Sequence, residues 1–212
     1  SMFKERFTHW IPLYINPQHA QRAKEKNLYT KAIGEIMMRD PSNFHPGKFQ
    51  TPWVLEVLTA TMNSMVVDWL KGEEHPSIKS LEGYCAYHRL LLMFAFDYPD
   101  LQKYANDKIS HFIENVDSRI KRVVPDLGCF LQLLTISKYR WVNIAGAYLE
   151  ESLDRTVKWV LEKCPDLFKL EPDPVIDATR AERHFKAASV SLKVAMFHVY
   201  FLENVSRPAD LT

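Results

Sequence analysis

The chain has 212 residues, enough to bury a full hydrophobic core in one domain or in two closely packed subdomains. Hydrophobic residues make up 47% and charged residues 25%, which is ordinary for a globular protein, and only six glycines disfavour a turn-rich β-sandwich or propeller. The net charge of +1 gives no sign of the concentrated basic surface that binding to nucleic acid requires. The longest apolar run, Leu90–Phe96, is far too short to span a membrane.

Prolines and capping residues divide the chain into predicted helices. Asn16-Pro17 and Thr51-Pro52 have the order of an N-cap followed by proline in the first turn, where the missing N–H is no loss. Residues 118–124 are predicted to form a short helix or a loop, because the residue before Pro125 is pushed out of the helical region. The predicted helices span about residues 17–38, 51–72, 76–97, 99–115, 126–136 and 139–163, and from after Pro174 to about 204.

Apolar residues at helical spacing predict which faces are buried. In the third helix the run Leu90–Phe96 is apolar all round, so we expect neighbours to cover it on several sides. The expected buried face of this helix includes Leu81, Tyr84, Cys85, His88, Leu91, Leu92 and Ala95. In the two last helices the expected core residues include Tyr148, Leu149, Leu153, Val157, Phe185, Val190, Leu192, Val194 and Met196.

No stretch shows the strict alternation of a half-buried strand, so the predicted fold class is all-α. The lengths of the helices and loops predict an irregular helical bundle or a short α-solenoid of about seven helices in antiparallel hairpins. We expect a single domain over residues 3–207. Ser1-Met2 is interpreted as the remnant of a cleaved tag, and residues 208–212 as a disordered tail.

The three cysteines, Cys85, Cys129 and Cys164, are odd in number and contain no C-x-x-C spacing. This pattern argues against a disulfide framework and against structural zinc, and favours a reducing compartment such as the cytoplasm or nucleus. His111 could pair with Asp107 or Glu114 at helical spacing, but a stable metal site needs three or four ligands. No motif for binding nucleotides is present, so no metal, cofactor or small-molecule ligand is expected.

The strongest catalytic candidate is Cys85 with His88, because positions i and i+3 share one helix face and an imidazole can deprotonate a neighbouring thiol. Both lie on the predicted apolar face, however. Buried cysteine and histidine are more often core residues than catalysts.

Two basic clusters could contact phosphates or an acidic partner. One holds Arg119, Lys121 and Arg122, and the other holds Arg180, Arg183 and Lys186. Nearby acidic residues balance both clusters, which favours solvated faces over binding to nucleic acid. The sequence alone does not show whether the two clusters converge.

Two aromatic segments are candidate docking sites for a partner. The amino-terminal string includes Phe7, Trp10 and Tyr14, and it either packs along the body as a clasp or exposes an aromatic patch. The segment Phe44–Phe49 contains Phe44, His45 and Phe49, and reads as a loop, the kind of element that most often carries binding function.

Several strings resemble a poorly characterised all-helical segment of large eukaryotic multidomain proteins, some of which also carry ubiquitin-conjugating (E2-like) domains. These strings are Met62–Val67, Leu81–Leu91, Pro125–Gly128 and Phe130-Leu131. The resemblance covers only part of the chain and transfers no site residues. It implies a module taken from a bigger protein, in a ubiquitin-linked pathway.

The favoured hypothesis is a non-enzymatic helical scaffold for protein–protein interaction, because no complete catalytic constellation is present. One alternative is a thiol-dependent enzyme or ubiquitin-transfer accessory that uses Cys85. Another is a helical array that binds RNA or DNA through the basic clusters.

Overall fold

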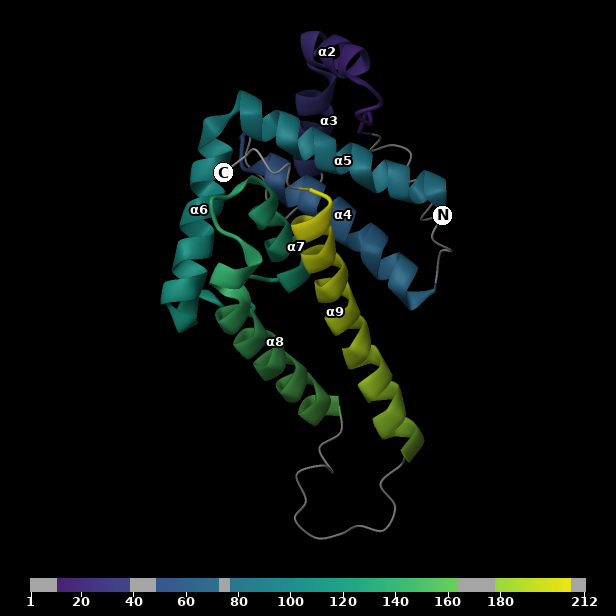
Figure 1. Ribbon diagram of the computed structural model, residues 1–212, viewed down its shortest axis with the longest axis vertical. Helices are drawn as coiled ribbons and strands as arrows, with labels where there is room; N and C mark the ends of the chain where they lie inside the picture. Colours follow the sequence, from purple (N-terminus) through teal and green to yellow (C-terminus); the bar gives the residue numbers. More distant parts are fainter. Residues whose placement is uncertain (1–10, 39–48, 73–76, 164–177, 207–212) are drawn as a thin grey trace.

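The computed structural model describes residues 11–38, 49–72, 77–163 and 178–206 (Figure 1). Throughout these ranges the chain forms helices and no strand, which confirms the all-α fold class. Both ends of the predicted domain, with the tag remnant and the tail, lie outside the described residues. The helices are α2 (Pro17–Glu25), α3 (Leu28–Met38), α4 (Trp53–Lys71), α5 (Ile78–Asp97), α6 (Pro99–Glu114), η2 (Val116–Ser118), α7 (Leu127–Leu131), η3 (Gln132–Ile136), α8 (Trp141–Lys163) and α9 (Ala178–Asn204).

The predicted single helix over residues 17–38 is wrong, because the chain forms two helices there, α2 and α3. Its start is as expected: the side chain of Asn16 accepts a hydrogen bond from the His19 N–H at 2.8 Å. The helix then ends at Glu25, and Asn27 adopts a φ of 53°. This left-handed conformation cannot continue a right-handed helix, and asparagine is among the few residues that tolerate it.

Helix α4 lies at the centre of the fold and contacts α3, α5, α7 and α9. Its core face carries Val54, Leu58, Met62 and Val66, which are all fully buried at a spacing of four residues. Helices α4 and α9 are in contact although they are far apart in sequence. The repeats of a solenoid, by contrast, contact only their neighbours. The fold is therefore an irregular bundle, not a solenoid.

Helix α5 lies across one end of the bundle and packs against α4 and α6 (Figure 1). Leu90 and Leu91 are fully buried, as expected, but Phe96 is 85% exposed and Leu81 is 46% exposed. The expectation that neighbours cover the whole apolar run is therefore wrong at Phe96. The neighbours cover only part of the helix circumference, and the run is long enough to reach the uncovered part.

Helices α8 and α9 run antiparallel and lie side by side (Figure 1). An ion pair between Arg140, just before α8, and Glu203, near the end of α9, joins them at 2.9 Å. Much of the core predicted for these helices is exposed to solvent, because no described element packs on that part of their surfaces. The exposed residues of this predicted core are Leu149, Leu153, Val157, Phe185, Leu192 and Met196.

No helix in the described part of the chain combines the length and hydropathy that crossing a bilayer requires.

Candidate functional site

A cleft of about 880 Å³ lies between α8 and α9, and we call it the α8/α9 cleft. One wall comes from α8 and includes Tyr148 and Trp159, and the opposite wall comes from α9 and includes Val190 and Val194. Helices α4 and α7 form its floor. Side chains of α4 and α7 line the cleft between the two walls, among them Asn63, Val67 and Leu127.

A chain of polar side chains lies at the floor of the cleft. Nδ2 of Asn63 donates to the carboxylate of Asp126 at 3.1 Å, and Oδ1 of Asn63 lies 2.9 Å from Nε2 of His198. Nδ1 of His198 then lies 3.4 Å from the hydroxyl of Tyr84. An amide oxygen can only accept, so Nε2 of His198 carries the proton and Nδ1 accepts from Tyr84. We call this chain the floor network.

Burial keeps most of the floor network uncharged. It lowers the pKa of His198 to about 4, although the nearby carboxylate of Asp126 partly opposes the shift. Burial also raises the pKa of Tyr84 well above its usual value, so its phenol stays protonated. His198 and Tyr84 are therefore both neutral at pH 7, and Asp126, at the start of the network, is exposed to the cleft.

The position of Asn63 depends on Gly128 in α7. A Cβ built on Gly128 would overlap the amide oxygen of Asn63. Asp126 caps the same helix by accepting the N–H of Cys129 at 2.8 Å. Helix α7 therefore approaches α4 closely enough for Asp126 and Asn63 to meet only because residue 128 has no side chain.

The rim of the cleft is more basic than acidic, with six Lys and Arg residues against four Asp and Glu among those that line it. Arg155 is paired with Glu151 at 2.7 Å, and Lys158 is paired with Asp154 at 2.6 Å. Three exposed lysines lack an ion pair within the described residues, and they come from two different parts of the chain. They are Lys121, Lys186 and Lys193.

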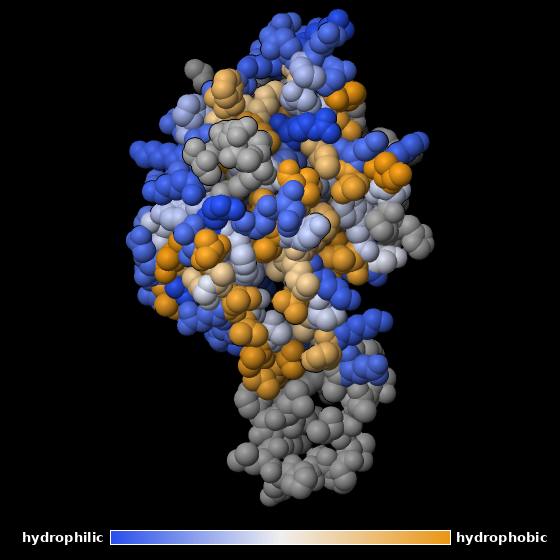
Figure 2. Space-filling model, viewed as in Figure 1, coloured by the Kyte–Doolittle hydropathy of each residue, from blue (hydrophilic) through white to orange (hydrophobic). Residues whose placement is uncertain are grey.

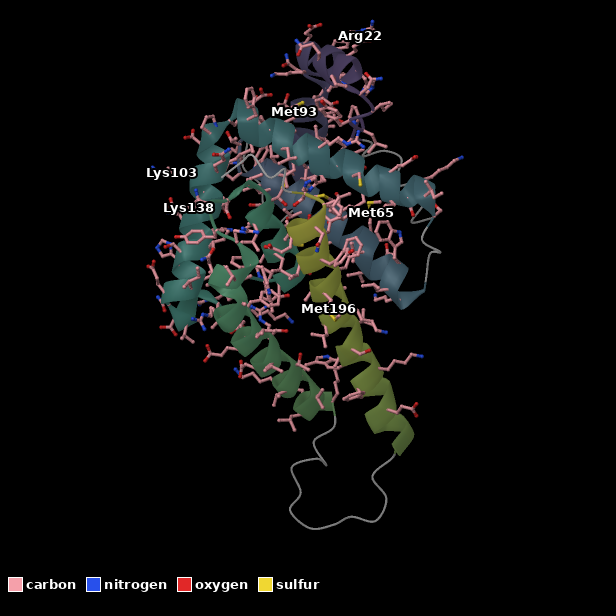
Figure 3. All side chains as sticks on the ribbon, viewed as in Figure 1. Arg22, Met65, Met93, Lys103, Lys138 and Met196 are labelled. Carbon is pink, nitrogen blue, oxygen red and sulfur yellow. The ribbon has the colours of Figure 1, made fainter. Side chains whose placement is uncertain are left out.

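Apolar side chains are exposed in the region of α8 and α9 on the face shown in Figure 2, and those of the two stripes below are not part of the cleft lining. Met196 lies about midway along α9 (Figure 3). The α8 stripe consists of Leu149, Leu153 and Val157, which are 45–64% exposed, and the α9 stripe consists of Leu192, Met196 and Tyr200, which are 55–68% exposed.

The pair proposed for catalysis, Cys85 and His88, lies on α5 away from the cleft lining. Burial, with Arg89 nearby, lowers the pKa of His88 to about 4, and its ring packs edge-on against Phe201 with centroids 5.1 Å apart. No hydrogen bond joins the thiol to the imidazole in the described part of the chain. An imidazole with such a low pKa is a poor base for a thiol.

Cys129 is the second described thiol, and its environment also disfavours reactivity. Burial and the neighbouring Asp126 raise its pKa to about 12, so the nucleophilic thiolate is scarce at neutral pH. Cys164 lies outside the described residues.

The structure separates the members of the first basic cluster. Arg119 is buried, and its guanidinium donates to the carbonyls of Phe112 and Ile113 at 2.7 and 2.9 Å. These are orphan acceptors at the end of α6, so Arg119 caps that helix and is not free to bind a ligand. Lys121 and Arg122 are exposed, and Lys121 reaches the cleft rim.

The second cluster contributes one described side chain, that of Lys186. The backbones of Arg180 and Arg183 belong to α9, but their side chains lie outside the described part of the structure. Lys186 lines the cleft opposite α8. The two clusters therefore meet at the cleft through Lys121 and Lys186, a relationship that the sequence alone does not show.

Most of the predicted aromatic docking residues lie outside the described residues, namely Phe7, Trp10, Phe44 and His45. Tyr14 is half-buried and packs against the core. Phe49 is also half-buried, with its ring 6.3 Å from Trp53 and 6.5 Å from Tyr98. Both described members are therefore at least partly built into the body.

Sequence reasoning missed the two exposed stripes because it assigned five of their six residues, all except Tyr200, to the core. The only available signal is that the apolar arcs of α8 and α9 are broader than one packing face needs. Among the described residues no group of three or more His, Cys, Asp and Glu side chains could hold a metal ion.

The fold and site define an all-α bundle with a partly polar cleft between two antiparallel helices, α8 and α9. Comparison of the chain with models of protein families, with curated proteins and with solved structures finds no match.

Proposed function

We propose that this chain is a helical protein–protein interaction module and that a partner binds at the α8/α9 cleft. The observation that carries the proposal is the exposed apolar surface of the two helices that form the cleft walls, Leu149–Leu153–Val157 on α8 and Leu192–Met196–Tyr200 on α9. Contiguous apolar surface next to a groove is typical of interaction sites, because water contact with it costs free energy that a partner removes. Membership of a larger protein and of a ubiquitin-linked pathway are further parts of this proposal.

The thiol-enzyme alternative receives less support from the geometry. Its candidate base, His88, has a pKa of about 4 and is packed against an aromatic ring. The nucleic-acid alternative loses Arg119 to a capping role, although Lys121 and Lys186 do lie on one rim.

Affinity capture followed by binding measurements with purified components tests the proposal. The test variant is Leu153→Asp with Met196→Asp, which places one charge in each stripe. The matched control is Phe96→Asp, which charges an exposed aromatic on α5. We expect a captured protein, once purified, to bind the parent chain and the control equally and the double variant at least about tenfold more weakly. Capture of no protein, or binding that ignores the double variant, would contradict the proposal.

A further inference from the structure

We propose that the floor of the α8/α9 cleft is a binding site for an organic cation, an ammonium or guanidinium group carried on an apolar stem. The site consists of the carboxylate of Asp126, the hydroxyl of Tyr148 and the apolar side chains that line the cleft with them. The stripes of α8 and α9 are not part of this lining, so the inference goes beyond the interaction function proposed above and does not depend on it.

Asp126 presents a positioned carboxylate to the cleft. Its Oδ1 accepts from the N–H of Cys129 at 2.8 Å, and its two oxygens accept from Nδ2 of Asn63 at 3.1 and 3.2 Å. Asn63 is only 6% exposed and is itself held by His198, so the carboxylate has a rigid support. A carboxylate accepts about four hydrogen bonds, so Asp126 keeps capacity for a further donor. Asp126 forms no ion pair within the described ranges, and a donor in the cleft could reach it.

Tyr148 supplies a second polar group with unused capacity. It lines the cleft although only 3% of the residue is exposed, and its ring packs edge-on against Trp141 with centroids 5.5 Å apart. Its hydroxyl forms no hydrogen bond with the part of the chain that the structure describes. Burial raises the pKa of this phenol and the charge of Asp126 raises it further, against a smaller effect of Arg155, so the hydroxyl interacts with that carboxylate. Such buried polar groups normally have a partner, and a ligand donor between the two groups would supply one.

The cations that the structure positions at the cleft are already paired. Arg155 donates to Glu151 at 2.7 Å and to the carbonyl of Arg119, and Lys158 is paired with Asp154 at 2.6 Å. The positioned groups with unused capacity are therefore the carboxylate and the phenol described above. Oxygens of both kinds accept hydrogen bonds, so they favour a ligand that donates, and a positive charge on the donor strengthens the bonds.

An anion would have to rely on the exposed lysines of the cleft. Lys121, Lys186 and Lys193 form no ion pair within the described residues, and no side-chain hydrogen bond there holds any of them in one orientation. Ordering three long side chains around an anion costs conformational entropy. A cation at the floor uses groups that are already ordered, and exposed charges at the rim repel it only weakly through water.

The remaining lining suits an apolar stem. Clefts of about 300–1,000 Å³ with a mainly apolar lining and a few positioned polar groups are typical of sites for small organic ligands. This cleft has a volume of about 880 Å³. Its apolar lining includes Val67, Leu70, Leu127, Trp159, Val190 and Val194. The indole of Trp159 also offers an aromatic face of the kind that attracts a cation.

Titrations of the full chain, followed by chemical shifts in NMR, test the inference with three probes that share one apolar stem. The probes are phenylbutylamine, phenylbutanol and phenylbutanoate, which carry an ammonium, a hydroxyl and a carboxylate at neutral pH. We expect the amine to bind at least about tenfold more tightly than either of the others, because a charged donor contributes more than a neutral one to a hydrogen bond with a carboxylate.

Two conservative variants locate the head group. Asp126→Asn removes the charge, keeps a good N-cap for α7 and should weaken binding of the amine by about tenfold or more. Tyr148→Phe removes only the hydroxyl and should weaken it by about three- to tenfold. The matched controls are Asp107→Asn on α6 and Tyr200→Phe on α9, which change exposed residues outside the lining and should leave binding unchanged. Circular dichroism of every variant checks that the fold is retained.

Three results would overturn the inference: no binding of the amine, binding of the amine that ignores both Asp126→Asn and Tyr148→Phe, or binding of the carboxylate as tight as that of the amine. In the last case Lys186→Met with Lys193→Met should abolish binding of the carboxylate, which would assign an anion site. The same double variant should not weaken binding of the amine. Stripe-dependent binding of a protein partner would survive each of these results, so the two proposals fail separately.

A free amine and the lysine or arginine side chain of a protein carry the same head group, and competition distinguishes these two sources. Displacement of a captured partner by phenylbutylamine, together with weaker binding of that partner to Asp126→Asn, would show that the cation is a side chain of the partner. A partner that neither change affects would leave a free amine as the ligand. Both results retain the cation site.

Discussion

Nε2 of His198 lies 2.9 Å from the amide oxygen of Asn63, and this contact joins α9 to α4 across 135 residues of sequence. Through Asp126, the same asparagine connects both helices to the start of α7. The hydrogen bonds at the floor of the cleft therefore depend on the side-chain amide of Asn63, whose oxygen and nitrogen both take part in them. Four of the five predictions below test this floor and the core around it, and the last tests the end of α6.

Gly128→Ala should lower the free energy of unfolding by about 1–3 kcal/mol or more, because the new Cβ must displace the Asn63 amide from its partners. The matched control is Gly146→Ala in α8, where nothing lies within 4 Å of the added Cβ. That change should stabilise the protein by about 0.5–1 kcal/mol through helix propensity. Urea unfolding measures both, and equal effects would contradict the close approach at Gly128.

Asn63→Leu should cost about 2–4 kcal/mol, because it leaves His198 and Asp126 without their shared partner. Ser64→Leu, at the neighbouring exposed position on α4, is the control and should change stability by no more than about 0.5 kcal/mol. Thermal unfolding distinguishes the two, and a neutral Asn63→Leu would mean that the floor network does not contribute to stability.

Stability should fall as the pH is lowered from about 6.5 to about 4. The folded-state pKa values of His88 and His198 are lowered to about 4, against an ordinary value of 6.5 for histidine, so in this window the unfolded chain binds more protons than the folded one. Each histidine contributes at most about 3 kcal/mol to this loss, and the contribution is fully retained above pH 6.5.

The variant His88→Phe isolates one of these contributions. Nε2 of His88 has no hydrogen-bond partner within the described residues, and its ring packs on Phe201, so phenylalanine should fit. Urea unfolding between pH 7 and pH 4.5 should show that the free energy of unfolding falls less steeply for this variant than for the parent. Exposed His111→Gln is the control, and a parent-like slope in His88→Phe would refute the assignment.

Leu90→Ala should cost about 2–5 kcal/mol, because the side chain is fully buried and its removal leaves a cavity. Phe96→Ala, six residues further along the same apolar run, should change stability by only about 0.5 kcal/mol, since Phe96 is 85% exposed. Chemical unfolding tests the pair, and similar losses would mean that α5 is oriented differently in the bundle.

Arg119→Met should destabilise the protein by about 2–3 kcal/mol. The change removes hydrogen bonds from a charged donor to the carbonyls of Phe112 and Ile113, and an ion pair with Glu150 at 2.7 Å. Arg122→Met removes an exposed positive charge three residues away and should change stability by no more than about 0.5 kcal/mol. If both changes have the same small effect, Arg119 is exposed to solvent, as the balance of acidic and basic residues in the sequence predicts.

Local chemistry along the sequence determined the helices. Capping residues and prolines predicted the starts at Pro17 and Pro99 and the stop at Gly72, because these signals act within one turn. The break at Asn27 was missed, since asparagine only permits a left-handed conformation and does not require it. Five of the six residues in the two exposed stripes, all except Tyr200, were predicted as core, because periodicity shows that a face is apolar and not whether a neighbour covers it.

The sequence by itself therefore determined the all-α class, most of the helix bounds and the fully buried face of α4. Only the tertiary structure decided that Lys121 and Lys186 reach one cleft, that Arg119 caps α6, and that Asn63 meets both Asp126 and His198. The physical reason is range: helix formation depends on neighbours within about four residues, whereas Arg119 reaches carbonyls six and seven residues away and Asn63 contacts residues 63 and 135 positions away, which only packing brings together.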